Sequence, residues 1–145
     1  MQNYKKQIGL VAHDERKTDL LEWVKFNADK LRRHQLWATG TTGKVIEKYC
    51  KITVNCLKSG PLGGDQQLGA KIANNELDIL IFFWDPMAAQ PHDVDVKALL
   101  RMSVLYNVAT ACNRTTADFL IASDLFDHKY TPTLKDYSKY LDRIP

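Results

Sequence analysis

Five short apolar segments alternate along this chain with longer segments in which apolar residues recur at helical spacing. The short segments are residues 8–12, 36–38, 53–57, 79–84 and 108–111. No linker, low-complexity tract or internal repeat interrupts the alternation. Five successive strand–helix units predict a parallel sheet with right-handed crossovers and helices on both faces. We therefore expect a Rossmann-like, doubly wound α/β fold of three layers (α/β/α) around a five-stranded parallel sheet.

The expected helices follow from spacing and from start signals. Asp14 is expected to cap the first helix, in which Leu20, Val24, Ala28 and Leu31 form one buried stripe. The other helices are expected to reach about residue 49, to run from a loop at 59–65 to about 74, and to cover residues 96–106 and 116–122. A final helical turn is expected to pack onto the body near residues 137–141.

Length and composition exclude several classes of protein. A chain of 145 residues can bury roughly 70% of its unfolded surface, so we expect one domain over residues 1–145 without disulfide or metal staples. Cys50, Cys56 and Cys112 form no Cys-x-x-Cys pair, which indicates reduced thiols and a cytoplasmic protein. No apolar run suits a signal peptide or a membrane span. Because the net charge is only +3, neither nucleic acid nor membrane is an expected partner.

Polar and glycine-rich residues follow the carboxyl end of each expected strand, which is the edge where open α/β sheets bind ligands. His13 follows the first strand, residues 39–43 the second, residues 59–65 the third, and Asp85 the fourth. Five of the seven glycines lie in the second and third of these loops. This edge of the sheet is therefore the expected ligand site.

The two glycine-rich loops are suited to a phosphate group, because glycine lets backbone N–H groups approach an anion at a helix N-terminus. The hydroxyls of Thr39, Thr41 and Thr42 are further donors, and Lys17 is a candidate counter-charge. Taken alone, the threonine turn is better explained as a capped strand-to-helix turn. The second loop favours a small phosphorylated ligand, although neither loop matches a nucleotide-binding motif.

Asp65 and His92 are the candidate acid–base residues. By themselves, Asp65 is more simply a helix N-cap, and His92, expected in an irregular loop, is equally well a surface histidine. Small neighbours would let a substrate carbon reach the Asp65 carboxylate, which could then act as a general base on a carbon acid. An imidazole can polarise a carbonyl or shuttle a proton. His34 and His128 lie away from the strand ends and are expected to be structural or exposed.

A metal site is disfavoured. His92, Asp93 and Asp95 form one cluster of possible ligands, and His13 with Asp14 forms another. These carboxylates have simpler roles as caps and as partners that orient imidazoles. We expect neither a metal nor an organic cofactor.

Five segments together resemble the methylglyoxal synthase family: His13-Asp14 with Lys17, and residues 39–43, 59–67, 82–86 and 91–97. The resemblance runs from about Ile8 to Arg143. It implies conversion of dihydroxyacetone phosphate to methylglyoxal and inorganic phosphate, a bypass of glycolysis, without metal or organic cofactor. It also implies a homohexamer that phosphate inhibits.

Carried over residue by residue, the resemblance implies that Asp65 is the catalytic base, giving an enediol(ate) phosphate that eliminates phosphate. His92 would stabilise and reprotonate the oxygens, and Asp14, Asp85 and Asp95 would orient groups and relay protons. Arg143 matches a C-terminal arginine that approaches the phosphate. The residues expected to hold the phosphate and the reacting carbons are His13, Lys17, Thr39, Gly40, Thr41, Thr42, Ser59 and Gly60.

A binding module is the alternative to an enzyme, because related domains of this fold are allosteric ligand-binding parts of carbamoyl phosphate synthetase. Such a module needs the phosphate loops but not the base. Asp65, His92 and the lack of an attached catalytic domain in 145 residues favour the enzyme. We therefore expect a carbon–oxygen lyase acting on phosphates rather than a non-catalytic allosteric small-ligand-binding domain.

Overall fold

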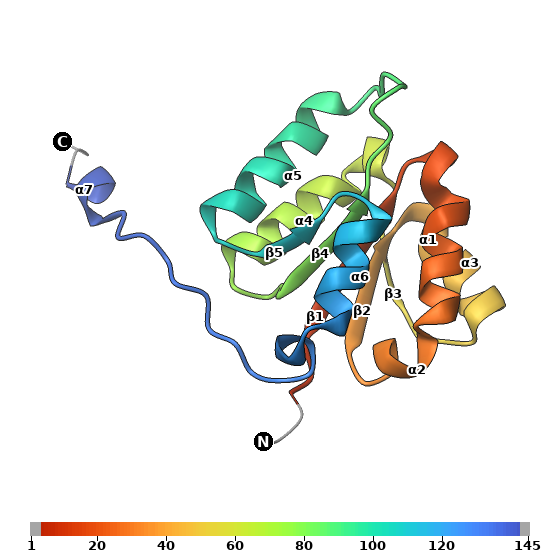
Figure 1. Ribbon diagram of the computed structural model, residues 1–145. Helices are drawn as coiled ribbons and strands as arrows, with labels where there is room; N and C mark the ends of the chain where they lie inside the picture. Colours follow the sequence, from red (N-terminus) through yellow and green to blue (C-terminus); the bar gives the residue numbers. More distant parts are fainter. Residues whose placement is uncertain (1–3, 143–145) are drawn as a thin grey trace.

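The computed structural model describes residues 4–142, and a parallel sheet of five strands lies at its centre (Figure 1). The strands are β1 (Gln7–Ala12), β2 (Gln35–Thr39), β3 (Asn55–Leu57), β4 (Ile79–Phe83) and β5 (Ala109–Ala111). They pair in the order β3-β2-β1-β4-β5, and every pair is parallel. The expected five-stranded parallel sheet is confirmed.

Helices cover both faces of the sheet. The helices are α1 (Lys17–Phe26), α2 (Ala28–Leu31), α3 (Gly40–Cys50), α4 (Gly64–Ala73), α5 (Asp93–Leu105), α6 (Arg114–Ala122) and α7 (Ser138–Leu141), with 3-10 turns η1 (Asp14–Arg16), η2 (Gly60–Leu62) and η3 (Asp124–Phe126). One face packs against α1, α3 and α6, and the other packs against α4 and α5 (Figure 1). The expected three-layer, doubly wound architecture is therefore confirmed.

Successive side chains of the central strands β1 and β4 point to opposite faces of the sheet and so contribute to both layers of the core. On β4, Ile81 and Phe83 pack toward α1 and α6, whereas Leu80 and Phe82 pack toward α4 and α5. Burying each such side chain contributes about 1.5–3 kcal/mol. All of β4 is buried, as expected for a central parallel strand. Trp84, the last residue of the expected apolar segment 79–84, lies one residue beyond the strand and is exposed.

The expected first helix is divided, and Asp14 does not cap it. No side-chain cap hydrogen bond is present at the start of η1 or of α1. The Asp14 carboxylate instead lies 3.0 Å from Lys17 Nζ, because a cation three residues along a helix faces it. The helix is interrupted at Asn27, whose backbone leaves the helical conformation with φ −104° and ψ 15° and whose side chain donates to the Trp23 carbonyl. The stripe of buried residues is nevertheless present on α1 and α2.

Two helices begin earlier than expected, and both shifts affect site residues. α3 begins at Gly40, so Thr41 and Thr42 lie in its first turn rather than in a preceding turn. α5 begins at Asp93, which makes His92 its N-cap and places Asp95 in its first turn. His92 is the last residue of the irregular segment between β4 and α5, which agrees with the loop position expected for it. Two acidic residues near an N-terminus suit the helix dipole, which explains the earlier start of α5.

The C-terminal segment runs away from the sheet and ends in α7 (Figure 1). The expected final turn is present, but Tyr137 and Tyr140 are 39% and 64% exposed, and their rings contact each other at 6.2 Å between centroids. The prediction that this turn packs onto the body is therefore wrong. None of the described helices is both long enough and apolar enough to cross a membrane.

Candidate active site

A cavity of about 250 Å³ opens at the carboxyl edge of the sheet. The strand order reverses between β1 and β4, and the crevice at such a reversal is where α/β sheets bind ligands. The cavity walls include residues that follow β1, β2 and β3 and residues that precede α5. The expected site residues on these walls are His13, Asp14, Lys17, Thr39, Gly40, Thr41, Thr42, Ser59, Gly60, Asp65 and His92. Four separate segments thus bring their polar residues to one cavity.

Two expected site residues, Asp85 and Asp95, are not among the described residues of these walls. Asp85 is buried beside the cavity, and its carboxylate accepts from the Met87 N–H at 2.9 Å. Asp95 lies on α5, where its carboxylate accepts from Gln66 Nε2 at 3.1 Å. Arg143 lies outside the described residues. The charges of Asp85 and Asp95 act to raise the pKa values of His13 and Asp65, respectively, but the hydrogen bonds of their carboxylates are to residues off the cavity wall.

Asp65 is a buried carboxylate without a hydrogen-bond partner. Its exposure is 1%, and neither oxygen has a partner among residues 4–142. It lies in the first turn of α4 but caps no N–H group, so the simpler N-cap interpretation is wrong. Burial raises the pKa of this carboxyl, the His92 imidazole opposes the rise, and Asp95 adds to it. A buried carboxyl with a raised pKa is well suited to accept a proton.

His92 lies next to Asp65 but does not complete a hydrogen bond with it. The distance from His92 Nε2 to Asp65 Oδ2 is 3.6 Å, which exceeds hydrogen-bond range. His92 Nδ1 is buried and also lacks a partner in the described part of the chain. The His92 carbonyl accepts from the N–H groups of Asp95 and Val96, so the first turn of α5 fixes the backbone. Both groups line the cavity, so a substrate can contact the imidazole and the carboxylate from that side.

His13 presents a hydrogen-bond donor to the same cavity. Its Nδ1 accepts from the Asp85 N–H at 3.1 Å, which places the proton of the neutral ring on Nε2. Burial lowers the pKa of His13, and the His92 ring 5.9 Å away lowers it further. His13 is therefore neutral near pH 7. Its Nε2–H is buried and finds no acceptor within the described residues, so it is available to a ligand.

Two glycines permit the close packing of the loop at residues 59–65. A Cβ atom on Gly60 would lie 2.5 Å from His92 Nε2. A Cβ atom on Gly64 would lie 1.9 Å from the Lys58 carbonyl oxygen. Real side chains do not tolerate either distance, so any larger residue must displace its neighbour. Gly60 thus allows the His92 imidazole to lie directly against the loop.

The part of the cavity next to α3 carries donors that suit an anion. The first turn of α3 lines it, and first-turn N–H groups have no partner within their own helix. Lys17 adds a cation whose ion pair with Asp14 is largely exposed, so the ammonium can also contact a bound anion. Within residues 4–142 no group of three or more His, Cys, Asp or Glu side chains is arranged to hold a metal ion.

Gln90 and Pro61 also line the cavity, and the sequence had not singled out either residue. Pro61 lies within the glycine-rich loop that the sequence did identify. Gln90 lies in the irregular segment between β4 and α5, and its backbone N–H donates to Asp93 Oδ2 at 3.1 Å. No spacing or residue type distinguishes Gln90 from the exposed residues before it. Its place on the wall follows from the turn that this hydrogen bond closes.

Comparisons with known proteins give one consistent result. The family model described as the MGS-like domain matches residues 19–112. Methylglyoxal synthase of Coxiella burnetii (strain Dugway 5J108-111) is 58% identical over 139 residues, which are 96% of this chain and 97% of that one. Methylglyoxal synthase of Leptospira interrogans serovar copenhageni is 59% identical over 133 residues, covering 92% and 90%. The crystal structure of methylglyoxal synthase from Elizabethkingia anophelis NUHP1 matches with a TM-score of 0.92 and 54% identity, covering 97% and 93%.

Proposed function

Because this chain belongs to the methylglyoxal synthase family, we propose that its cavity converts dihydroxyacetone phosphate to methylglyoxal and inorganic phosphate. The protein is a lyase of methylglyoxal biosynthesis with a small phosphorylated substrate. In finer detail, we assign it to the carbon–oxygen lyases acting on phosphates. The observation that carries the mechanism is the buried, unpartnered Asp65 carboxylate beside His92.

Asp65 removes a proton from the hydroxymethyl carbon of the substrate. The electron pair of the broken C–H bond forms a C=C bond to the carbonyl carbon, and the carbonyl oxygen becomes the enediol(ate) oxygen. His92 stabilises this oxygen and returns a proton to it, and the neutral His13 donates a hydrogen bond. The raised pKa of Asp65 supports this role, because a base works best when its pKa approaches the working pH.

Elimination follows from the same intermediate. The hydroxyl on the former hydroxymethyl carbon loses its proton and forms the aldehyde, the C=C bond moves to the next carbon pair, and the C–O bond to phosphate breaks. Proton transfer to the terminal carbon of the resulting enol then gives methylglyoxal. Elimination is fastest when the breaking C–O bond stands perpendicular to the enediolate plane, so the groups that hold the phosphate determine the product.

The phosphate group is held by the donors that surround the start of α3. Thr41 and Thr42 supply N–H and hydroxyl groups in its first turn, Gly40 lets the anion approach the backbone there, and Lys17 supplies charge. Thr39, Ser59 and Gly60 extend this set on the neighbouring loops. Arg143 is proposed to reach the phosphate from the C-terminal tail. Helix N-termini and oriented donors are a recurring way to bind phosphate, which supports this assignment.

The remaining carboxylates are positioning residues. Asp85 supports His13 through its backbone N–H, and Asp14 positions Lys17. Asp95 raises the pKa of Asp65 and is proposed to relay protons with it. We also propose that residues 1–145 form one domain, since both core layers close on one sheet.

Further proposals concern the assembly and its setting. We propose a cytoplasmic homohexamer that inorganic phosphate inhibits by occupying the phosphate position of the substrate. The family resemblance supports these proposals. Light scattering measures the oligomer directly. A strict monomer would contradict the proposed homohexamer.

The proposed function is tested by supplying dihydroxyacetone phosphate and trapping the product with o-phenylenediamine as a quinoxaline. We expect methylglyoxal and inorganic phosphate in equal amounts. A protein that binds phosphate without forming product would instead be a ligand-binding module. Product formation that persists after loss of the Asp65 carboxylate would remove the mechanism but leave the function.

A further inference from the structure

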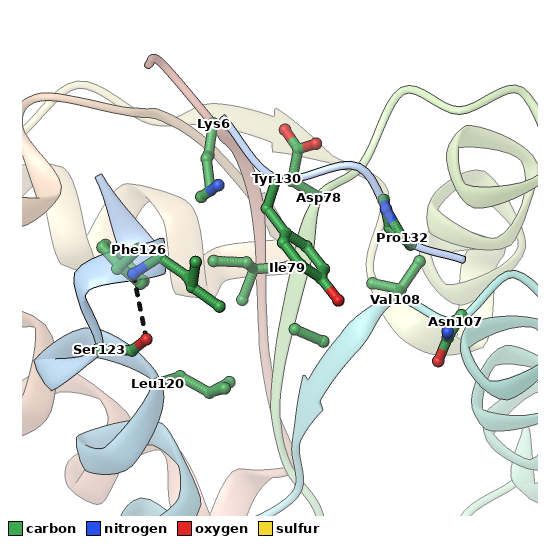
Figure 2. Close-up of a pocket in the computed structure, with 12 residues that line it drawn as sticks. Lys6, Asp78, Ile79, Asn107, Val108, Leu120, Ser123, Phe126, Tyr130 and Pro132 are labelled. Carbon is green, nitrogen blue, oxygen red and sulfur yellow. Dashed lines mark hydrogen bonds between the residues drawn. The ribbon is translucent and has the colours of Figure 1, made fainter. Parts of the chain in front are cut away.

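A second cavity, of about 290 Å³, opens at the opposite edge of the sheet (Figure 2). Its walls come from residues that precede β4 and β5, from the end of α6, from η3 and from the tail. It shares no lining residue with the candidate active site. Lys6 and Asp78 line it directly before β1 and β4, whereas His13 and Asp85 follow those same strands. The two cavities therefore lie at opposite ends of the same two central strands.

Lys6 supplies the charged group of this second cavity. Its side chain is nearly buried, with an exposure of only 5%, and its Nζ donates to the His128 carbonyl at 2.6 Å. An ammonium carries three protons, so this bond leaves donors for a ligand. No carboxylate in the described part of the chain forms an ion pair with it. Burial lowers the pKa of Lys6, while Asp78 and Asp127 act in the other direction from farther away.

Asp127, one of the two neighbouring carboxylates, is fully engaged elsewhere. It lies 2.8 Å from His34 Nε2, 3.7 Å from Lys30 Nζ and 3.6 Å from Arg33 Nη1. Burial lowers the pKa of His34, which keeps that ring neutral near pH 7. The Asp127 charge is thus already matched by Lys30 and Arg33. It does not neutralise the Lys6 ammonium.

Asp78 is the other neighbouring carboxylate, and its Oδ2 accepts the Gln7 N–H at 2.8 Å. Among the described residues that line the cavity, Lys6 is the one cation and Asp78 the one anion. The Asp78 carboxylate already accepts a backbone N–H, whereas the Lys6 ammonium keeps protons for a further acceptor. The free donors of Lys6 are therefore suited to an anionic group.

Apolar and aromatic side chains form most of the remaining wall. Ile79 is the first residue of β4, Val108 directly precedes β5, and Phe126 contributes to the wall from η3. Figure 2 shows the Tyr130 ring lying between Lys6 and Val108, with its hydroxyl on the Val108 side. Apolar walls with a few convergent polar groups are typical of small-molecule sites. The walls suit a flat or branched apolar group next to an acid.

We propose that this cavity binds a small monocarboxylate with an aromatic or branched apolar body. The carboxylate contacts the Lys6 ammonium, and the body packs against Ile79, Val108 and Phe126. This site is separate from the proposed active site and stands whether or not the catalytic mechanism holds. A bound ligand contacts the residues that immediately precede β1 and β4, the strands that carry His13 and Asp85 at their far ends.

Phenylacetate is the probe, and its neutral isostere phenylacetamide is the matched control ligand. Saturation-transfer NMR on the full-length protein, in its native assembly, measures the affinity of each. We expect saturable binding of phenylacetate and at least about tenfold weaker binding of phenylacetamide, because a charge-assisted hydrogen bond is lost. Inorganic phosphate is expected not to displace the probe. Equal binding of the two probes, or displacement by phosphate, would overturn the proposal.

Protein variants test the same site. Lys6→Met should weaken phenylacetate binding at least about tenfold, whereas the exposed neighbour Lys5→Met should leave it unchanged. Ala109→Leu fills the cavity from an exposed position on β5 and should also abolish binding, with little risk to folding. Normal binding in both Lys6→Met and Ala109→Leu contradicts the site. So does the absence of any saturable binding, as expected if a second copy of the chain fills the cavity.

Discussion

Two histidine–aspartate pairs lie at opposite edges of the same sheet and differ in every contact. At the amino edge, His34 Nδ1 accepts the Lys6 N–H at 3.0 Å, and its Nε2 lies 2.8 Å from Asp127. At the carboxyl edge, His92 and Asp65 are 3.6 Å apart, and His92 Nδ1 and both Asp65 oxygens lack partners within residues 4–142. The protein supplies hydrogen-bond partners for the His34–Asp127 pair, which we call the satisfied pair. It supplies none within residues 4–142 for His92 Nδ1 and the Asp65 oxygens, so we call His92–Asp65 the open pair.

The contrast separates a structural role from a functional one. Buried polar groups are almost always hydrogen-bonded, so a pair without partners needs an explanation. Burial raises the pKa of Asp65. Burial acts in the same direction on Asp127, but the His34 hydrogen bond and the cations Lys30 and Arg33 outweigh it and lower that pKa. The satisfied pair therefore stabilises the fold, whereas the open pair is available to a substrate.

The largest expected effect is that of Asp65→Asn on catalysis. Removing the base should slow methylglyoxal formation about a thousandfold, in the range typical of general-base catalysis. The free energy of unfolding should be unchanged or higher, because an unpartnered buried charge is removed. Quinoxaline trapping and urea unfolding measure the two quantities. Asp19→Asn, at a largely exposed ion pair, is the matched control and should leave both unchanged.

His34→Ala should give the opposite result. It leaves Asp127 without its closest partner and removes a buried ring, so we expect a loss of about 3 kcal/mol in the free energy of unfolding. The rate per folded molecule should be unchanged, since the pair lies far from the candidate active site. His128→Ala keeps the carbonyl that Lys6 uses and should lose about 1 kcal/mol or less. A stable but inactive His34→Ala protein would contradict the division of roles.

Gly60→Ala should disturb the open pair without unfolding the protein. The added Cβ would meet His92 Nε2 at 2.5 Å, so the imidazole must move. Misplacing a catalytic group by a fraction of an ångström reduces the rate steeply, and we expect a drop of about tenfold or more in kcat/KM. Gly69→Ala is the control, because no atom lies within 4 Å of its new Cβ. Equal activity of the two variants would show that the position of His92 does not matter.

The smallest expected effect is a difference in how stability depends on pH. The folded pKa of Asp65 lies above 3.8, so its ionisation removes stability as the pH rises from 3.8 through the folded value. The folded pKa of Asp127 lies below 3.8, so its contribution is present above 3.8 and is lost as the pH falls through the folded value. Unfolding of wild type, Asp65→Asn and Asp127→Asn across this range should give difference curves of opposite slope. Parallel curves would contradict the comparison.

The sheet and its ligand-binding edge could be predicted from the sequence, because both depend on local patterns. The apolar run in β4 and the glycines after β2 and β3 can each be recognised in a short stretch of sequence. The beginning of α5 was missed, since Asp93 and Asp95 favour an earlier helix start that apolar spacing does not register. Gln90 was missed because a turn, not a motif, places it on the wall.

The hydrogen-bond partners of the two histidines could not be predicted from local spacing. His34 was expected to be structural or exposed, and it is buried against Asp127, a residue 93 positions away. No local pattern reports a partner that distant, because only the assembled sheet brings the two together. For Asp65 the local pattern was misleading. Its position at a helix start predicts an N-cap hydrogen bond, but in the folded structure neither carboxylate oxygen has a partner among the described residues.

The central claim is that Asp65 is an open, buried carboxyl while Asp127 is a satisfied one, and a single titration measures both. Carbon-13 labelling of aspartate, with signals assigned through Asp65→Asn and Asp127→Asn, follows each carboxyl by NMR as the pH changes. We predict a midpoint above 3.8 for Asp65 and below 3.8 for Asp127. A midpoint for Asp65 at or below that of Asp127 would contradict the account.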